Sequence, residues 1–238
     1  MLDIKGLMPT SLIEYPGKIA AVVFLNQCNF RCPFCQNASL AQGTEQAPSI
    51  PKEQVLEFLK SRKKWLDGVA ITGGEPTLAG EELVSFIKEI KSLGLAVELE
   101  TNGSNPELLK ELMRQKLVDY YAMDYKAPLE DYGRVTGVAN VDTQKIKESA
   151  SLIMNEAENA GFDYEFRATV VPGLFDERSA LRIAQELKGA RRFFLQQFQP
   201  RDCLDSSFNK LAAFPPQRLQ EFATIMRPFI AEVKTRGI

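Results

Sequence analysis

The chain has 238 residues, 45% of them hydrophobic, which is enough to bury the core of one large α/β domain. It carries 29 basic and 31 acidic residues, so its net charge of -2 gives no reason to expect binding to nucleic acid or to a membrane surface. The first residues lack the pattern of a secretory signal, and no apolar run approaches the roughly 18 residues of a membrane span. We therefore expect a cytoplasmic protein.

The chain divides into a short arm and a long repeating region. Residues 1–18 contain two glycines and two prolines around short apolar pieces, which predicts an N-terminal hairpin or arm. Over residues 19–238, a strand-like apolar run alternates six times with a segment of helical periodicity, which we interpret as a single domain. The predicted strands are residues 20–26, 69–72, 96–101, 120–125, 164–171 and 193–198.

Six consecutive βα units predict an α/β fold with parallel strands and right-handed helical crossovers. Periodicity alone does not decide whether such a sheet curls into a partial barrel or stays open. In either case, ligands collect at the C-terminal ends of the strands. Functional residues are therefore expected where each predicted strand ends.

Three of the four cysteines follow the first predicted strand. Cys28, Cys32 and Cys35 have the spacing C-x3-C-x2-C, so each thiolate can bind a different iron of a 4Fe-4S cluster and leave one iron free. Closely spaced cysteines are also typical of structural zinc sites, which close four ligands around the metal. The chain has no histidine, so the fourth zinc ligand would be Cys203 or a carboxylate. Both interpretations stay open at this point.

Polar stretches follow the next strands as well. Paired glycines after the second strand let the backbone approach a ligand closely, although an ordinary turn has the same pattern. Polar side chains buried without a partner cost several kcal/mol, so those at the later strand ends are expected to contact solvent or a ligand. These stretches contain Gly73, Gly74 and Glu75, then Glu100, Thr101 and Asn102, then Asp124 and Lys126, and finally Arg167 on the fifth strand.

These motifs together resemble the radical S-adenosylmethionine (SAM) superfamily, whose signature C-x3-C-x-aromatic-C has Phe34 in the aromatic position here. The resemblance implies a six-stranded partial (β/α) barrel of the TIM type. It implies that Cys28, Cys32 and Cys35 bind a 4Fe-4S cluster whose open iron is chelated by the methionine part of SAM. An electron from the cluster then cleaves SAM, and the resulting 5'-deoxyadenosyl radical abstracts hydrogen from a substrate.

Within this superfamily, the chain resembles the activating enzymes of glycyl radical enzymes. Glu100 stands where these enzymes often carry aspartate. The histidine that pyruvate formate-lyase activases carry near Gln199 is missing, which counts against pyruvate formate-lyase as the partner. The SAM-binding residues implied by the resemblance are Phe34, Gly73, Gly74, Glu75, Glu100, Thr101, Asn102, Asp124, Lys126 and Arg167.

The N-terminal arm narrows the resemblance further. Its S-x-x-E-x-P-G stretch from Ser11 to Gly17 is similar to the activating proteins of anaerobic ribonucleoside-triphosphate reductase. The implied partners are the glycine loop of that reductase and a flavodoxin or ferredoxin as electron donor, with no membrane or nucleic acid. The alternatives are an activase of another glycyl radical enzyme, a small-molecule enzyme of the 7-carboxy-7-deazaguanine synthase type, and a non-enzymatic zinc module.

Two further residues receive structural interpretations. Cys203 is expected to be a free thiol near the barrel mouth, and no role follows for it from the sequence. Trp65 is expected to pack within the protein rather than to recognise a partner.

Overall fold

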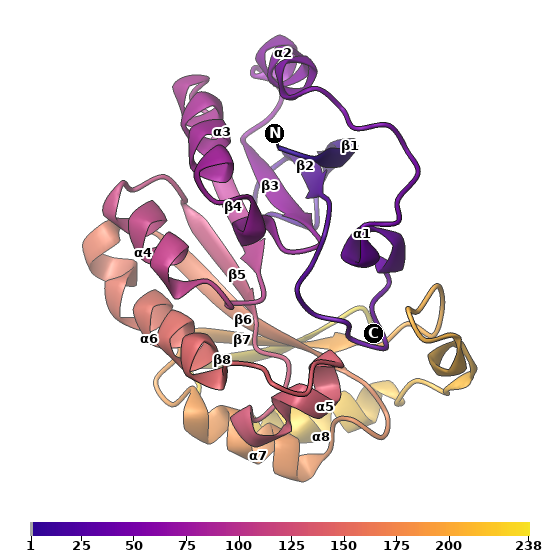
Figure 1. Cartoon of the computed structure of the whole chain (residues 1–238). Helices are drawn as coiled ribbons and strands as arrows, with labels where there is room; N and C mark the ends of the chain where they lie inside the picture. The colour runs from indigo at the N-terminus through magenta and orange to yellow at the C-terminus, as the bar shows by residue number, and fades with distance from the viewer. Residues whose placement is uncertain (1) are drawn as a thin grey trace.

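The computed structural model describes residues 2–238 and has a curved eight-stranded sheet with helices on its outer side (Figure 1). Strand order in the sheet follows chain order, β1 is antiparallel to β2, and every later pair of neighbours is parallel. The strands are β1 Ile4–Ser11, β2 Ala20–Leu25, β3 Gly68–Gly73, β4 Ala96–Thr101, β5 Tyr120–Asp124, β6 Asp163–Val170, β7 Arg192–Gln197 and β8 Glu232–Arg236. The fold is an α/β partial barrel, as the resemblance to the radical SAM superfamily implies.

The six predicted strands correspond to β2 through β7, and the predicted arm contains β1. Met1 lies outside the described residues. The last strand, β8, was not predicted, and it extends the parallel part of the sheet by one strand. Its sequence Glu-Val-Lys-Thr-Arg is mostly polar, and only Val233 within it is buried. An edge strand of this kind lacks the apolar run that marks the central strands.

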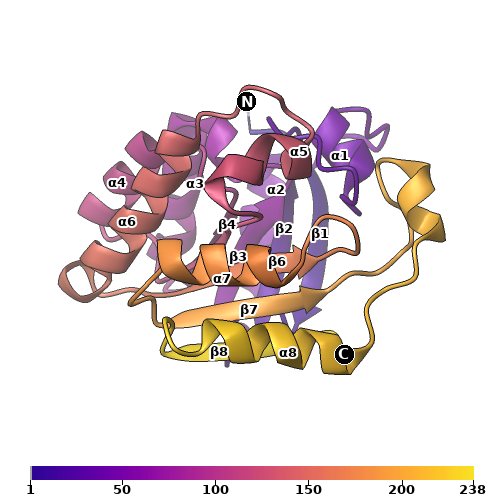
Figure 2. The same ribbon diagram turned by 90° about the horizontal axis from the view of Figure 1, so that it is seen from below.

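The helices connect successive parallel strands and cover the outer face of the sheet, with α7 and α8 running beside β7 and β8 (Figure 2). No helix within residues 2–238 is long and apolar enough to cross a membrane. The α-helices are α1 Ala38–Gln42, α2 Lys52–Arg62, α3 Glu81–Ser92, α4 Pro106–Arg114, α5 Tyr132–Thr136, α6 Thr143–Ala160, α7 Glu177–Glu186 and α8 Pro216–Met226. Three 3-10 helices lie at η1 Pro76–Ala79, η2 Leu129–Asp131 and η3 Ser206–Lys210.

Apolar side chains of the helices and strands pack into a continuous core between the two layers. In contrast, the inner face of the curved sheet carries charged side chains. Glu165 is buried and accepts hydrogen bonds from Tyr120 Oη (2.8 Å) and Arg236 NH1 (3.0 Å). Glu98 is fully buried on the same face of β4 as Glu100, and neither of its carboxylate oxygens has a hydrogen-bond partner within residues 2–238.

The buried position of Glu98 predicts a measurable pH dependence of stability. Burial, with Glu100 as the next cause, raises the pKa of Glu98 well above its ordinary value of 4.5, against an opposing effect of Arg167. The nearby Glu165 and Glu14 raise it further. Glu98 therefore keeps its proton in the folded state at pH values where the unfolded chain has lost it, so stability falls as pH rises above about 4.5.

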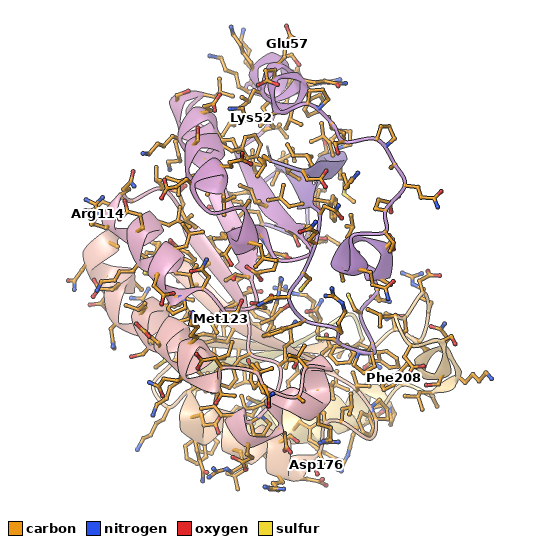
Figure 3. All side chains as sticks on the ribbon, in the orientation of Figure 1. Lys52, Glu57, Arg114, Met123, Asp176 and Phe208 are labelled. Carbon is orange, nitrogen blue, oxygen red and sulfur yellow. The ribbon has the colours of Figure 1, made fainter. Side chains whose placement is uncertain are left out.

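Replacing Glu98 with glutamine is expected to remove this contribution. Urea unfolding between pH 4 and pH 8 should show a free energy of unfolding that declines less steeply in Glu98→Gln than in the unmodified protein. The control is Glu57→Gln, which changes an exposed glutamate on α2 (Figure 3) and should keep the original pH slope. Equal slopes for Glu98→Gln and the unmodified protein would contradict the assignment.

Candidate active site

The cysteine loop, residues 26–37, leaves β2 at the C-terminal edge of the parallel strands. Gln27 has a positive φ of 68°, which turns the chain out of the strand. Its N-H donates to the Leu40 carbonyl in α1 (2.8 Å), and its own carbonyl accepts from the Glu75 N-H (2.7 Å). The start of the loop is thus fixed both to α1 and to the segment after β3.

The three clustered cysteines are free thiols on this loop. Cys32 is buried, whereas Cys28 and Cys35 are partly exposed. Burial raises the pKa of all three thiols, to about 12 for Cys32, and the ammonium group of Lys126 counteracts this rise in each case. Because metal coordination removes the thiol proton, a nearby cation favours the form that binds metal.

An ion-pair network around the buried side chain of Arg167 lines the same cavity as the cysteine loop and joins the ends of neighbouring strands. The guanidinium of Arg167 on β6 contacts Glu100 on β4 (2.6 Å) and Asp124 on β5 (2.6 Å). Asp124 also pairs with Lys126 (2.8 Å), and Glu100 accepts from the Thr72 hydroxyl on β3 (2.6 Å). Burial alone would raise the pKa of Asp124, but Lys126 and Arg167 hold it well below its ordinary value. The network therefore contains two carboxylates balanced by two cations.

Glu75 ties the end of β3 to the end of β4. One carboxylate oxygen accepts from the Thr77 N-H (3.1 Å), the Thr77 hydroxyl (2.6 Å) and the Thr101 hydroxyl (2.8 Å). The other accepts from the Asn102 N-H (2.6 Å). Only 1% of Glu75 is exposed, so its carboxylate mainly holds the ends of β3 and β4 together through these hydrogen bonds.

The two glycines before Glu75 permit a close approach of backbones. Gly73 has φ of +122°, a conformation that residues with a side chain rarely adopt. A Cβ on Gly74 would lie 1.8 Å from the Gln27 carbonyl oxygen. Glycine is therefore required where the end of β3 meets the cysteine loop.

These groups line one cavity of about 370 Å³ at the C-terminal ends of the strands. The structure brings together in its wall every residue that the sequence analysis assigned to the site: Cys28, Cys32, Phe34, Cys35, Gly73, Gly74, Glu75, Glu100, Thr101, Asn102, Asp124, Lys126 and Arg167. The wall also contains residues to which the sequence analysis gave no role, among them Glu14, Phe24, Thr169, Gln196 and Phe198. Glu14 comes from the N-terminal arm, and no local pattern indicates that it reaches the barrel interior.

The segment after β7 lies against the cysteine loop. The Leu204 N-H donates to the Cys35 carbonyl (3.0 Å), and the Asp205 N-H donates to the Pro33 carbonyl (2.9 Å). Phe208, labelled in Figure 3, belongs to the same segment. Cys203 in this segment is a free, buried thiol. No three Cys, His, Asp or Glu side chains of residues 2–238 converge on a single metal ion. A cluster does not require such convergence, since each thiolate binds a different iron.

A model of the radical SAM superfamily matches residues 22–182, more than half of the chain. The chain belongs to the radical SAM superfamily. Enzymes of this superfamily bind a 4Fe-4S cluster and SAM. The cavity of this radical SAM protein suits both groups, because three free thiols on one loop supply the soft donors that iron-sulfur clusters use and polar side chains lie next to them.

Two relatives place the chain among the activases of glycyl radical enzymes. It is 32% identical to a Methanocaldococcus jannaschii protein provisionally named glycyl-radical enzyme activating enzyme, over 99% of this chain and 96% of that one. It is 28% identical to the pyruvate formate-lyase-activating enzyme of Clostridium pasteurianum, over 79% of this chain and 77% of that one. The protein is therefore a radical SAM enzyme of the activase type.

A solved structure supports the fold independently. The Streptococcus suis protein SuiB, crystallised with its precursor peptide SuiA, matches with a TM-score of 0.67 at 17% identity. The match covers 91% of this chain but 48% of that one, so the chain spans about half the length of SuiB. At this identity the similarity concerns the fold alone.

Proposed function

We propose that this enzyme uses SAM to generate a glycyl radical on the anaerobic ribonucleoside-triphosphate reductase. The observation that carries the proposal is the single cavity in which three free thiols adjoin a polar cradle built from four consecutive strand ends. Similarity to an activating enzyme over nearly the whole chain supports it. The choice of the reductase as partner rests on the S-x-x-E-x-P-G arm between Ser11 and Gly17.

In this proposal the residues of the cavity divide into two groups. Cys28, Cys32 and Cys35 hold the cluster, beside the aromatic side chain of Phe34. The groups around SAM are the backbone of Gly73 and Gly74, with Glu75 behind it, and the side chains of Glu100, Thr101, Asn102, Asp124, Lys126 and Arg167. When bound, the cluster and SAM supply one-electron cleavage chemistry that ends in removal of a hydrogen atom from the substrate.

The protein's own contribution is to bind and orient these groups. The ion-pair network holds Arg167 in a fixed position, where a guanidinium can bind the carboxylate of an amino acid. The glycine backbone lets the end of β3 pack directly against the start of the cysteine loop. No proton has to be transferred by a general base, which agrees with a site that contains no histidine.

The proposal includes the setting of the reaction. A flavodoxin or ferredoxin would supply the electron, and the cytoplasm would supply the reducing conditions that free thiols need. The substrate glycine lies on a loop of a partner protein, so this loop has to enter the cavity in an extended conformation.

The decisive experiment reconstitutes the protein with iron and sulfide without oxygen and incubates it with SAM, dithionite and the purified reductase. The expected result is an electron paramagnetic resonance doublet from a glycyl radical on the reductase, with one methionine formed per radical. Parallel reactions with pyruvate formate-lyase test the other partner class. A small molecule that consumes SAM stoichiometrically while the reductase stays radical-free would refute the proposal. So would a protein that takes up one zinc ion and no iron.

A further inference from the structure

Part of the cavity wall has no role in the proposed binding of the cluster and SAM. It includes Phe24 on β2, Thr169 on β6, Gln196 on β7, and Phe198 and Gln199 directly after β7. These residues line the same cavity as the proposed SAM cradle, four of them from β6, β7 and the segment after β7, and Phe24 from β2. The proposed binding of the cluster and SAM leaves these wall residues without an assigned ligand.

Thr169 and Gln196 form a polar pair in this wall. They are register partners on the neighbouring parallel strands β6 and β7, and both are partly buried. Thr169 lies two residues after Arg167, so both side chains project from the same face of β6. Within residues 2–238, the hydroxyl of Thr169 and the carboxamide of Gln196 have no hydrogen-bond partner.

The chemistry of this wall favours a peptide over an anionic small molecule. A carboxamide offers two donors and one acceptor group, and a hydroxyl offers one donor with acceptor capacity, so the pair matches the N-H and C=O of a peptide unit. Sites for carboxylates or phosphates use arginine or lysine instead. Outside the proposed cofactor residues, Glu14 is the one charged side chain in the described cavity wall, and its carboxylate would repel an anion.

We infer that Gln196 and Thr169 bind main-chain amide groups of the extended, glycine-bearing segment of the partner protein and position that segment beside the proposed SAM site. An extended segment is required, because the main-chain groups of a helix are already paired internally. The apolar rings of Phe24 and Phe198 contact the segment without demanding particular side chains. This inference rests on the proposed function and names the residues that would recognise its substrate.

The test uses the reconstituted enzyme with SAM and a fluorescent synthetic peptide that copies the glycine-containing segment of the reductase. Fluorescence anisotropy should give a dissociation constant at least about tenfold higher for Gln196→Leu and for Thr169→Val, since each leaves a peptide group unpaired. The matched control is Gln54→Leu, an exposed glutamine on α2, which should bind the peptide as the unmodified protein does. Unchanged affinity in both cavity variants would overturn the inference.

A second probe asks whether main-chain groups are recognised. Peptides carrying a single N-methyl group at successive positions should include one that binds the unmodified enzyme about tenfold more weakly, with little further loss in Gln196→Leu. If the N-methyl group weakened binding to Gln196→Leu by the same factor as binding to the unmodified enzyme, the two changes would act independently. That result would contradict a direct contact between Gln196 and the peptide group. Cluster content and SAM affinity are measured in each variant as a control. If a variant lost cluster, SAM affinity and peptide affinity together, the replaced residue would have a structural role, and the inference would be overturned.

The two proposals fail in different ways. If the unmodified enzyme places a radical on the reductase but both cavity variants bind the peptide normally, only the assignment of Gln196 and Thr169 is wrong. If the unmodified enzyme places no radical on the reductase, the proposed function is wrong, and this inference fails with it.

Discussion

Replacing Cys32 with alanine is expected to lower the rate of reductive SAM cleavage by more than about 100-fold, because changes to mere supporting groups of metal sites already cost 10- to 100-fold. Cys32 is the buried one of the three thiols on the cysteine loop, whereas Cys28 and Cys35 are partly exposed. The measurement is 5'-deoxyadenosine formation with dithionite, together with iron content and far-ultraviolet circular dichroism.

Cys203→Ala is the matched control for this prediction. Cys203 is also a free, buried thiol, but it lies outside the cavity wall. Its replacement should leave iron content and SAM cleavage unchanged. Normal SAM cleavage by Cys32→Ala, or equal losses in the two variants, would refute the assignment of Cys32 as a cluster ligand.

Replacing Arg167 with alanine is expected to lower the free energy of unfolding by about 3–5 kcal/mol. The guanidinium contacts both Glu100 and Asp124, and only 8% of its side chain is exposed. Its removal leaves Glu100, whose side chain is only 14% exposed, without its cation, and an unpaired charge shielded from water is costly. Urea unfolding of the metal-free protein at pH 7 measures the loss without any contribution from bound SAM.

Arg114→Ala provides the comparison for a surface ion pair. Arg114 contacts Glu111 at 2.6 Å, a similar distance, but its side chain is 70% exposed on the outer face of α4 (Figure 3). Its loss should cost less than about 1 kcal/mol. If both variants lost the same small amount, the network around Arg167 would not contribute to stability in the way its burial indicates.

Much of the site could be predicted because parallel strands end at one edge of a sheet. Cys28 follows β2, Glu75 follows β3 and Arg167 lies on β6, yet all three line the same cavity. The apolar runs identified the strands, and the geometry of βα units then placed polar residues from distant parts of the chain together. Local sequence and topology were sufficient for these residues.

Other features depend on tertiary contacts that local patterns do not encode. Glu14 reaches the cavity from the connection between β1 and β2, and Thr169 and Gln196 are paired through the register of β6 and β7. The prediction that Trp65 packs within the protein was wrong, because 74% of this residue is exposed. Aromatic character alone favours burial but does not determine it.

The four hydrogen bonds that converge on Glu75 come from the protein itself, so they do not depend on a bound molecule. This part of the cavity is accordingly preorganised: SAM bound as proposed would meet backbone that is already held in place by the protein. Immobilising a flexible side chain on association costs about 0.5–1.5 kcal/mol. Backbone that is already held in place by Glu75 avoids this loss of affinity. In the proposed site, Glu75 would therefore favour ligand binding without having to contact the ligand.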